Sequence, residues 1–145
     1  MPRFGMTTLH PSFGRVYLAS QNWVEVELTD GLDLSLDHCY ELERIIRKET
    51  AEPYVLLGHC RSLREMQFEA KARISTFPGS AAVAIVIHAE ACVASVDDVI
   101  AVADIQQGNV RAFQDEAAAR AWLEVDLRLA RGANEIPIEL PSDPA

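Results

Sequence analysis

Clustered positive charge is missing from this sequence. Its 145 residues include 13 Lys and Arg against 22 Asp and Glu, which gives a formal net charge of −9 at pH 7. The basic residues are interleaved with acidic ones, as in the neighbouring pairs Glu43/Arg44 and Arg64/Glu65. A protein that binds a nucleic-acid backbone gathers Lys and Arg on one surface, where they displace the counterions of the phosphates. We therefore expect no nucleic-acid partner.

Cysteine is scarce, and long apolar runs are absent. The three cysteines, Cys39, Cys60 and Cys92, form no Cys-x-x-Cys pair. An odd number of cysteines without a secretory signal is typical of reduced thiols in the cytosol. The first ten residues lack an apolar signal segment. The longest apolar run, Ala81 to Ile87, is far shorter than the roughly 20 residues that span a bilayer. We expect a cytoplasmic protein that does not enter the membrane.

Motifs for catalysis and cofactor binding are also missing. The sequence has no glycine-rich phosphate loop, no His-Glu-x-x-His and no Gly-x-Ser-x-Gly. The candidate for nucleophilic catalysis is Cys60 beside His59, but neighbours on an extended segment point to opposite sides. Cys39 and Cys92 fall on apolar helix stripes, where a free Cys behaves as a small hydrophobic side chain. We predict that the protein is not an enzyme and holds no cofactor.

The residues that are present are sufficient for one domain. Apolar residues make up 49% of the chain, and its length falls within the roughly 100–200 residues of a typical domain. Residues 1–14 are predicted to be a loose leader. Residues 15–130 are predicted to form the domain, and residues 131–145 a flexible tail with acidic residues and prolines.

Hydrophobic periodicity predicts alternating strands and helices. Residues 15–19 and 23–28 are typical of two strands of a hairpin. Short apolar runs at 54–57, 82–87 and 109–113 predict three more strands. Helices are predicted from Leu36 to Lys48 with Ser35 as N-cap, from Ser62 to Ile74 with a Ser62–Glu65 capping box, from Glu90 to Asp104, and from Glu116 to Ala130 with Asp115 as N-cap. This order predicts an α/β fold with a mostly parallel sheet of four or five strands, an antiparallel N-terminal hairpin and about four helices.

Four segments resemble the SpoIIAA-like group of small bacterial proteins. They are Val24 to Ser35, Leu56 to Leu63, Ala82 to Ile87 and Val110 to Leu123. The group is related in fold to the STAS domain of anti-sigma-factor antagonists and is compared with the lipid-binding SEC14 fold. The resemblance covers roughly residues 15 to 125 and implies a SpoIIAA/STAS-like single domain.

The resemblance is structural, and two departures bear on function. The group commonly has an Asp after the third strand, where this sequence has His59. Anti-sigma antagonists carry an Asp-Ser-Gly-like phosphorylation motif at that turn, and this sequence has none. The resemblance implies a non-catalytic regulatory or protein-interaction domain, which works through a protein partner or a second copy of the chain.

Candidate binding residues gather where the predicted parallel strands end. Ligands of parallel α/β sheets bind outside the carboxyl ends of the strands. Those ends carry His59, Arg61, Ser62 and His88. Arg61 and Ser62 at a helix N-terminus can hold an anion, while the simpler alternative makes Ser62 an N-cap and pairs Arg61 with a carboxylate.

A zinc site is the other alternative at these strand ends. His59 and His88 would lie near each other if their strands are neighbours, and Cys60 or Cys92 could complete the ligand set. No ligand spacing within one element enforces such a site. We therefore interpret the two histidines as capping or loop residues and predict no metal.

Two other functions stay open beside the interaction domain. One is a carrier that binds a small apolar or anionic ligand between helices and sheet, and the other is an enzyme that uses His59 or His88. A closed apolar cavity of several hundred Å³ would favour the carrier, and a filled core the interaction domain. The poorly defended edge of strand 15–19 favours a homodimer, unless the leader folds back over that edge.

Overall fold

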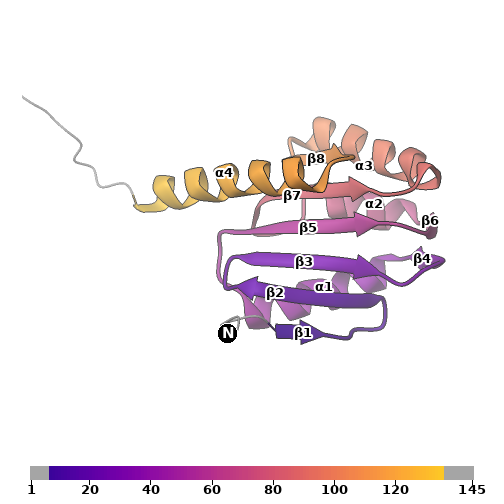
Figure 1. Cartoon of the computed structure of the whole chain (residues 1–145), viewed down its shortest axis with the longest axis horizontal. Coiled ribbons are helices and arrows are strands. Elements are labelled where there is room, and N and C mark those ends of the chain that lie inside the picture. Colours follow the sequence, from indigo (N-terminus) through magenta and orange to yellow (C-terminus); the bar gives the residue numbers. More distant parts are fainter. Residues whose placement is uncertain (1–6, 136–145) are drawn as a thin grey trace, which may run out of the picture.

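The structure, a computed structural model, describes residues 7–135. Its main sheet has six strands in the order β1-β2-β3-β5-β7-β8 (Figure 1). Neighbours are antiparallel from β1 to β3 and parallel from β3 to β8. A separate parallel pair joins β4 to β6. The strands are β1 (Thr7–Leu9), β2 (Gly14–Ser20), β3 (Trp23–Leu28), β4 (Leu32–Leu34), β5 (Tyr54–Cys60), β6 (Leu63–Met66), β7 (Ser80–Ile87) and β8 (Val110–Phe113).

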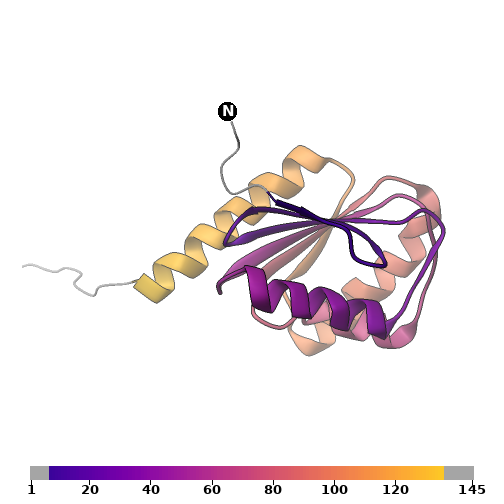
Figure 2. The same cartoon turned by 90° about the horizontal axis from the view of Figure 1, so that it is seen from below.

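The helices cover the two faces of the sheet unequally. On one face lie α1 (Leu36–Glu49), α2 (Phe68–Ser75) and α3 (Val93–Gln106), the last preceded by a short 3-10 turn at Glu90–Cys92 (Figure 2). Each of these helices connects two parallel strands, and because such crossovers share one hand, they gather on one face. The last helix, α4 (Glu116–Glu135), lies on the other face.

Each face has its own apolar core. On the three-helix side, Val24, Val26, Leu56 and Ile85 of the strands are buried against α1, α2 and α3. On the α4 side, the strand residues Val55, Leu57, Ala84 and Val86 pack with Ala119 and Leu123 of α4. The helix contacts β5, β7 and β8. Within residues 7–135, β1 and β2 therefore have no helix over this face (Figures 1 and 2).

The predicted α/β class, the mostly parallel sheet and the antiparallel N-terminal hairpin are confirmed. The sheet is larger than predicted because Thr7–Leu9, assigned to the leader from the sequence, pairs with β2. This strand covers the edge of β2, so that edge no longer argues for a homodimer. Residues 1–6 of the predicted leader lie outside the described residues.

The predicted capping box at Ser62 is wrong. Leu63–Met66 is strand β6, and it pairs with β4. Helix α2 begins only at Phe68, and its N-cap, Gln67, makes no side-chain capping bond. The pairing with β4 buries Met66 and Leu34 in the core. A long-range contact of this kind outweighs a local pattern that is also compatible with a helix.

The final helix is longer than predicted. It continues to Glu135, so residues 131–135 of the predicted tail are helical, and residues 136–145 lie outside the described part of the chain. Gly132 does not end the helix, because a single exposed glycine costs a helix only about 1 kcal/mol. No helix within residues 7–135 has both the length and the apolar character needed to cross a bilayer.

Candidate functional site

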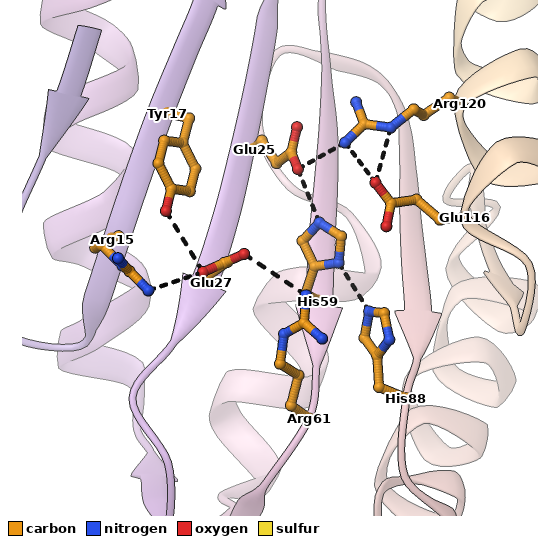
Figure 3. A network of polar contacts seen from close by, with 9 residues as sticks. All are labelled: Arg15, Tyr17, Glu25, Glu27, His59, Arg61, His88, Glu116 and Arg120. Carbon is orange, nitrogen blue, oxygen red and sulfur yellow. Dashed lines mark hydrogen bonds and ion pairs between the residues drawn. The ribbon is translucent and has the colours of Figure 1, made fainter.

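A polar network lies on the α4 side of the sheet, near the carboxyl ends of the parallel strands (Figure 3). Alternation along β3 places Glu25 and Glu27 on this face, opposite the buried Val24 and Val26. In β5, His59 is on the same face as Leu57. Since β3 and β5 are parallel and Glu27 is paired with His59 in the register, both glutamates lie beside this histidine.

His59 is the buried centre of the network, with only 3% of its surface exposed. Its Nε2 lies 2.9 Å from Oε2 of Glu25, and its Nδ1 lies 2.9 Å from Nε2 of His88. His88 follows β7 directly and is exposed. The two imidazole rings are stacked, with centroids 5.1 Å apart.

These contacts keep the carboxyl group of Glu25 ionised. Burial acts to raise the pKa of Glu25, but hydrogen bonds from His59 and Arg120 and the charge of Arg120 outweigh it, so this pKa is lowered. Glu25 is thus a carboxylate that accepts hydrogen bonds from His59 Nε2 and from Arg120 Nη2 at 2.8 Å. In the neutral form of His59, Nδ1 is then an acceptor that faces His88. The partial burial of the His88 ring, with the positive charge of Arg61, lowers the pKa of His88 and favours its neutral form.

Residues at the amino end of α4 complete the network. Asp115 accepts a hydrogen bond from the backbone N–H of Ala117 at 3.1 Å, which confirms the predicted cap. One turn on, Arg120 donates to Oε2 of Glu116 from Nε at 2.9 Å and from Nη2 at 2.6 Å. This pair brings Glu116 to the histidines. The potential ligand atoms of His59, His88 and Glu116 all lie within 4.8 Å of one another.

Glu27 organises the half of the network that is nearest the edge of the sheet. Its carboxylate lies 3.2 Å from Nη2 of Arg15, 3.6 Å from Nη2 of Arg61 and 3.5 Å from the hydroxyl of Tyr17. The pairing of Arg61 with a carboxylate over the sheet end is as predicted. With 47% of its side chain exposed, Arg61 is a rim residue.

The structure brings together only part of the predicted site. His59 and His88 meet, as expected for residues on neighbouring strands. Ser62 lies in the exposed turn between β5 and β6, where its carbonyl accepts a hydrogen bond from the N–H of Gly31. Because α2 begins six residues later, the predicted anion site of Ser62 at a helix N-terminus is wrong.

The cysteines do not join the histidines. Cys60 alternates with His59 and points into the core on the three-helix face, where it meets Cys92. Burial raises the pKa of the Cys60 thiol, and a hydrogen bond with Cys92 raises it further. Burial also raises the pKa of Cys39 to about 12. The alternative of a zinc site with a thiolate ligand is therefore wrong, and no thiol forms a dyad with His59.

Sequence reasoning missed Glu25, Glu27, Glu116 and Arg120 as members of the site. Two patterns in the sequence could have identified them. The alternation from Trp23 to Leu28 places two acids on the polar face of a strand, and the spacing of Glu116 and Arg120 is that of an ion pair on a helix. Neither pattern reveals which histidine these residues contact.

The sequence matches no protein-family model and none of the curated proteins. Among solved structures it is similar to an uncharacterized protein of the DUF3478 family with a SpoIIAA-like fold, from Shewanella loihica PV-4. The two share 15% identity with a TM-score of 0.49, over 81% of this chain and 91% of the other.

Proposed function

We propose that this protein is a non-catalytic interaction domain that pairs with a second copy of itself through the carboxyl-terminal half of α4. This half of the helix runs out past the beginnings of the neighbouring strands (Figures 1 and 2). The observation that supports the proposal is the exposure of two apolar side chains on this half of the helix: Val125 is 46% exposed and Leu129 is 66% exposed. Residues four apart lie on the same side of a helix, so the two side chains form one apolar stripe.

The surface next to the stripe suits a helix from another molecule. A groove separates the last turns of α4 from the start of β3, and it is lined by Trp23, Leu127, Arg128 and Arg131. Partly exposed aromatic and Arg side chains are the types that dominate the energetics of protein interfaces. The adjoining face of β1 and β2 has no helix over it within the described residues, which leaves room for a partner.

Symmetry favours a second copy as the occupant. Most closed dimers have two-fold symmetry, so a helix at such an interface pairs antiparallel with itself. A two-fold axis near Leu127 places Val125 of one chain opposite Leu129 of the other. In this arrangement the apolar stripes of the two copies cover each other.

The two alternative functions receive less support. The apolar cavity between the sheet and α1 and α2 has a volume of about 80 Å³. Small-molecule sites usually measure about 300–1,000 Å³, so a carrier would need a larger space. For the alternative of an enzyme that uses His59 or His88, no thiol nucleophile is at hand, because Cys39 and Cys60 lie in the core of the three-helix face and burial raises the pKa of both thiols.

The test is the mass of the full chain in solution, measured by light scattering over a series of micromolar concentrations. We expect a mass that approaches twice the 16.0 kDa of one chain as concentration rises. The double variant Val125→Glu/Leu129→Glu places four like charges at the proposed interface of the dimer. It should remain at the mass of one chain.

The matched control is Ile105→Glu, which changes an even more exposed apolar side chain on α3, across the sheet from α4. This variant should still dimerise, and circular dichroism should show that all variants are folded. A wild-type mass that stays near 16 kDa at every concentration would contradict the proposal. So would a double variant that dimerises as well as the wild type.

A further inference from the structure

Two imidazoles and a carboxylate meet on the α4 side of the sheet, at residues that lie far apart in the sequence. We propose that His59, His88 and Glu116 bind one Zn²⁺ ion, with Glu25 as the residue that positions His59. The ligand atoms come from β5, from the residue after β7 and from the first turn of α4. Three protein ligands of this kind leave the fourth position of a tetrahedral zinc to water.

The environment of His59 is the strongest support. A histidine that binds a metal through one ring nitrogen usually donates the hydrogen of the other to a carboxylate, which fixes the tautomer and orients the ring. Here Nε2 of His59 donates to Glu25 at 2.9 Å, and the side chain is 2% exposed. In the neutral form of His59, Nδ1 is then an acceptor, directed toward His88 and Glu116. Glu25 is itself held by Arg120, so this geometry exists before any ion arrives.

The spacing of the two histidines fits a metal after a small adjustment. Their facing nitrogens are 2.9 Å apart, as in a hydrogen bond. Zinc–nitrogen bonds of 2.0–2.1 Å at a tetrahedral angle require a separation of about 3.3 Å between them. The rings must therefore move apart by a few tenths of an ångström.

Glu116 can bind the ion and keep its partner. Both hydrogen bonds from Arg120 use Oε2, and within the described residues no hydrogen bond reaches Oε1. One carboxylate oxygen is thus available. Because His88 is exposed and the side chain of Glu116 is 40% exposed, an ion reaches the site from solvent without any opening of the core.

The donor set selects the kind of metal. Mg²⁺ and Ca²⁺ prefer six or more oxygen ligands, whereas imidazole nitrogens suit Zn²⁺, copper and nickel. Soft thiolate ligands are absent from the cluster, because Cys60 and Cys92 lie on the other face of the sheet. Two imidazoles with one carboxylate form a common zinc ligand set.

The experiment is a titration of the metal-free full chain with Zn²⁺ by isothermal calorimetry, followed by the same titration with Co²⁺ as a spectroscopic probe. We expect one ion per chain and the strong visible absorption of tetrahedral Co²⁺. His88→Ala and Glu116→Gln change surface side chains and should fold normally. Each should weaken zinc binding by more than the 10–100-fold that is typical for loss of a supporting residue. Glu25→Gln should weaken it within about that 10–100-fold range.

The matched control is His10→Ala/Glu49→Gln, which removes an exposed histidine and the exposed carboxylate that ends α1 on the three-helix face. It should bind zinc as the wild type does. Absence of one-to-one binding would overturn the proposal and leave the cluster as a hydrogen-bond network. Binding that survives in His88→Ala and Glu116→Gln would also overturn it, since the ion would then lie elsewhere. The readouts do not depend on dimerisation, so the proposed function and the metal site can fail separately.

Discussion

At the residue scale, one carboxylate joins the turn after β1 to α1. Glu41 accepts hydrogen bonds from the hydroxyl of Ser12 at 2.5 Å and from its backbone N–H at 3.1 Å. These two bonds lower the pKa of Glu41, with Ser12 as the main cause. A carboxyl group with a lowered pKa in the folded state stabilises the protein above its unfolded value, and this stabilisation is lost as pH falls through the folded value.

We therefore expect Ser12→Ala to raise the pKa of Glu41 toward 4.5 and to lower the free energy of unfolding at pH 7. The difference from the wild type should shrink as pH falls through the folded pKa, because the protonated carboxyl gains less from Ser12. NMR titration of the Glu41 side chain measures the pKa. Urea unfolding at several pH values measures the stability.

The control for Ser12 uses Glu41→Gln as the background. With no titrating group at position 41, Ser12→Ala should change the stability by the same amount at every pH. A pH-dependent effect that persists in this background would show that another group responds to Ser12.

The candidate site shows which contacts between residues can be predicted from the sequence. The two apolar runs were correctly predicted as strands, and His59 and His88 were expected to meet if these strands are neighbours, which they are. The contact of His59 with Glu25 was not predicted, because it depends on the register of β3 against β5. Periodicity predicts on which face of the sheet a side chain lies. The register cannot be read in the same way, because it depends on how strands distant in sequence pair.

At the element scale, the β2–β3 hairpin requires glycine where it begins. Gly14 has a φ of +149°, and a Cβ at this position would lie 2.0 Å from the backbone carbonyl oxygen of Glu27 in β3. No rotation of a side chain can relieve a contact between two backbones. Gly14→Ala must therefore push β2 and β3 apart at Glu27, which also belongs to the polar network.

We expect Gly14→Ala to lower the free energy of unfolding by about 2 kcal/mol or more, since backbone strain alone costs 1–3 kcal/mol. Urea denaturation is the measurement. The control is Gly132→Ala in α4, where a Cβ meets nothing within 4 Å. Alanine should gain up to about 1 kcal/mol there, as in an ordinary helix. Equal effects at the two positions would contradict the strain at Gly14.

Elements differ in how far the sequence predicts them. The strong apolar runs gave β5 and β7, and helical periodicity gave α1, α3 and α4. Ser62–Glu65 has the pattern of a capping box, yet the residues after Ser62 form strand β6 because Leu32–Leu34 offers a partner for it. The three residues of β1 have no periodicity at all, and only the pairing with β2 makes them a strand.

At the scale of the whole molecule, the two faces of the sheet differ in the features that they carry. The three-helix face contains the larger core, with its cavity of about 80 Å³. The α4 face carries the polar network and the exposed stripe of α4. If the cavity is only a packing defect, filling it should change neither the polar network nor the exposed stripe of α4 on the other face.

Gly58 provides the means to fill it. This residue of β5 lines the cavity, its φ is not positive, and a Cβ there would have its nearest neighbour, the carbonyl oxygen of Ala84, at an ordinary 4.0 Å. We expect Gly58→Ala to raise the free energy of unfolding by about 0.4–1 kcal/mol, because alanine restricts the unfolded chain. Urea denaturation measures the gain, and light scattering and zinc titration should match the wild type. A loss of stability would show that the cavity has no room for the methyl group, and a changed mass or zinc affinity would show that the cavity is coupled to the α4 face.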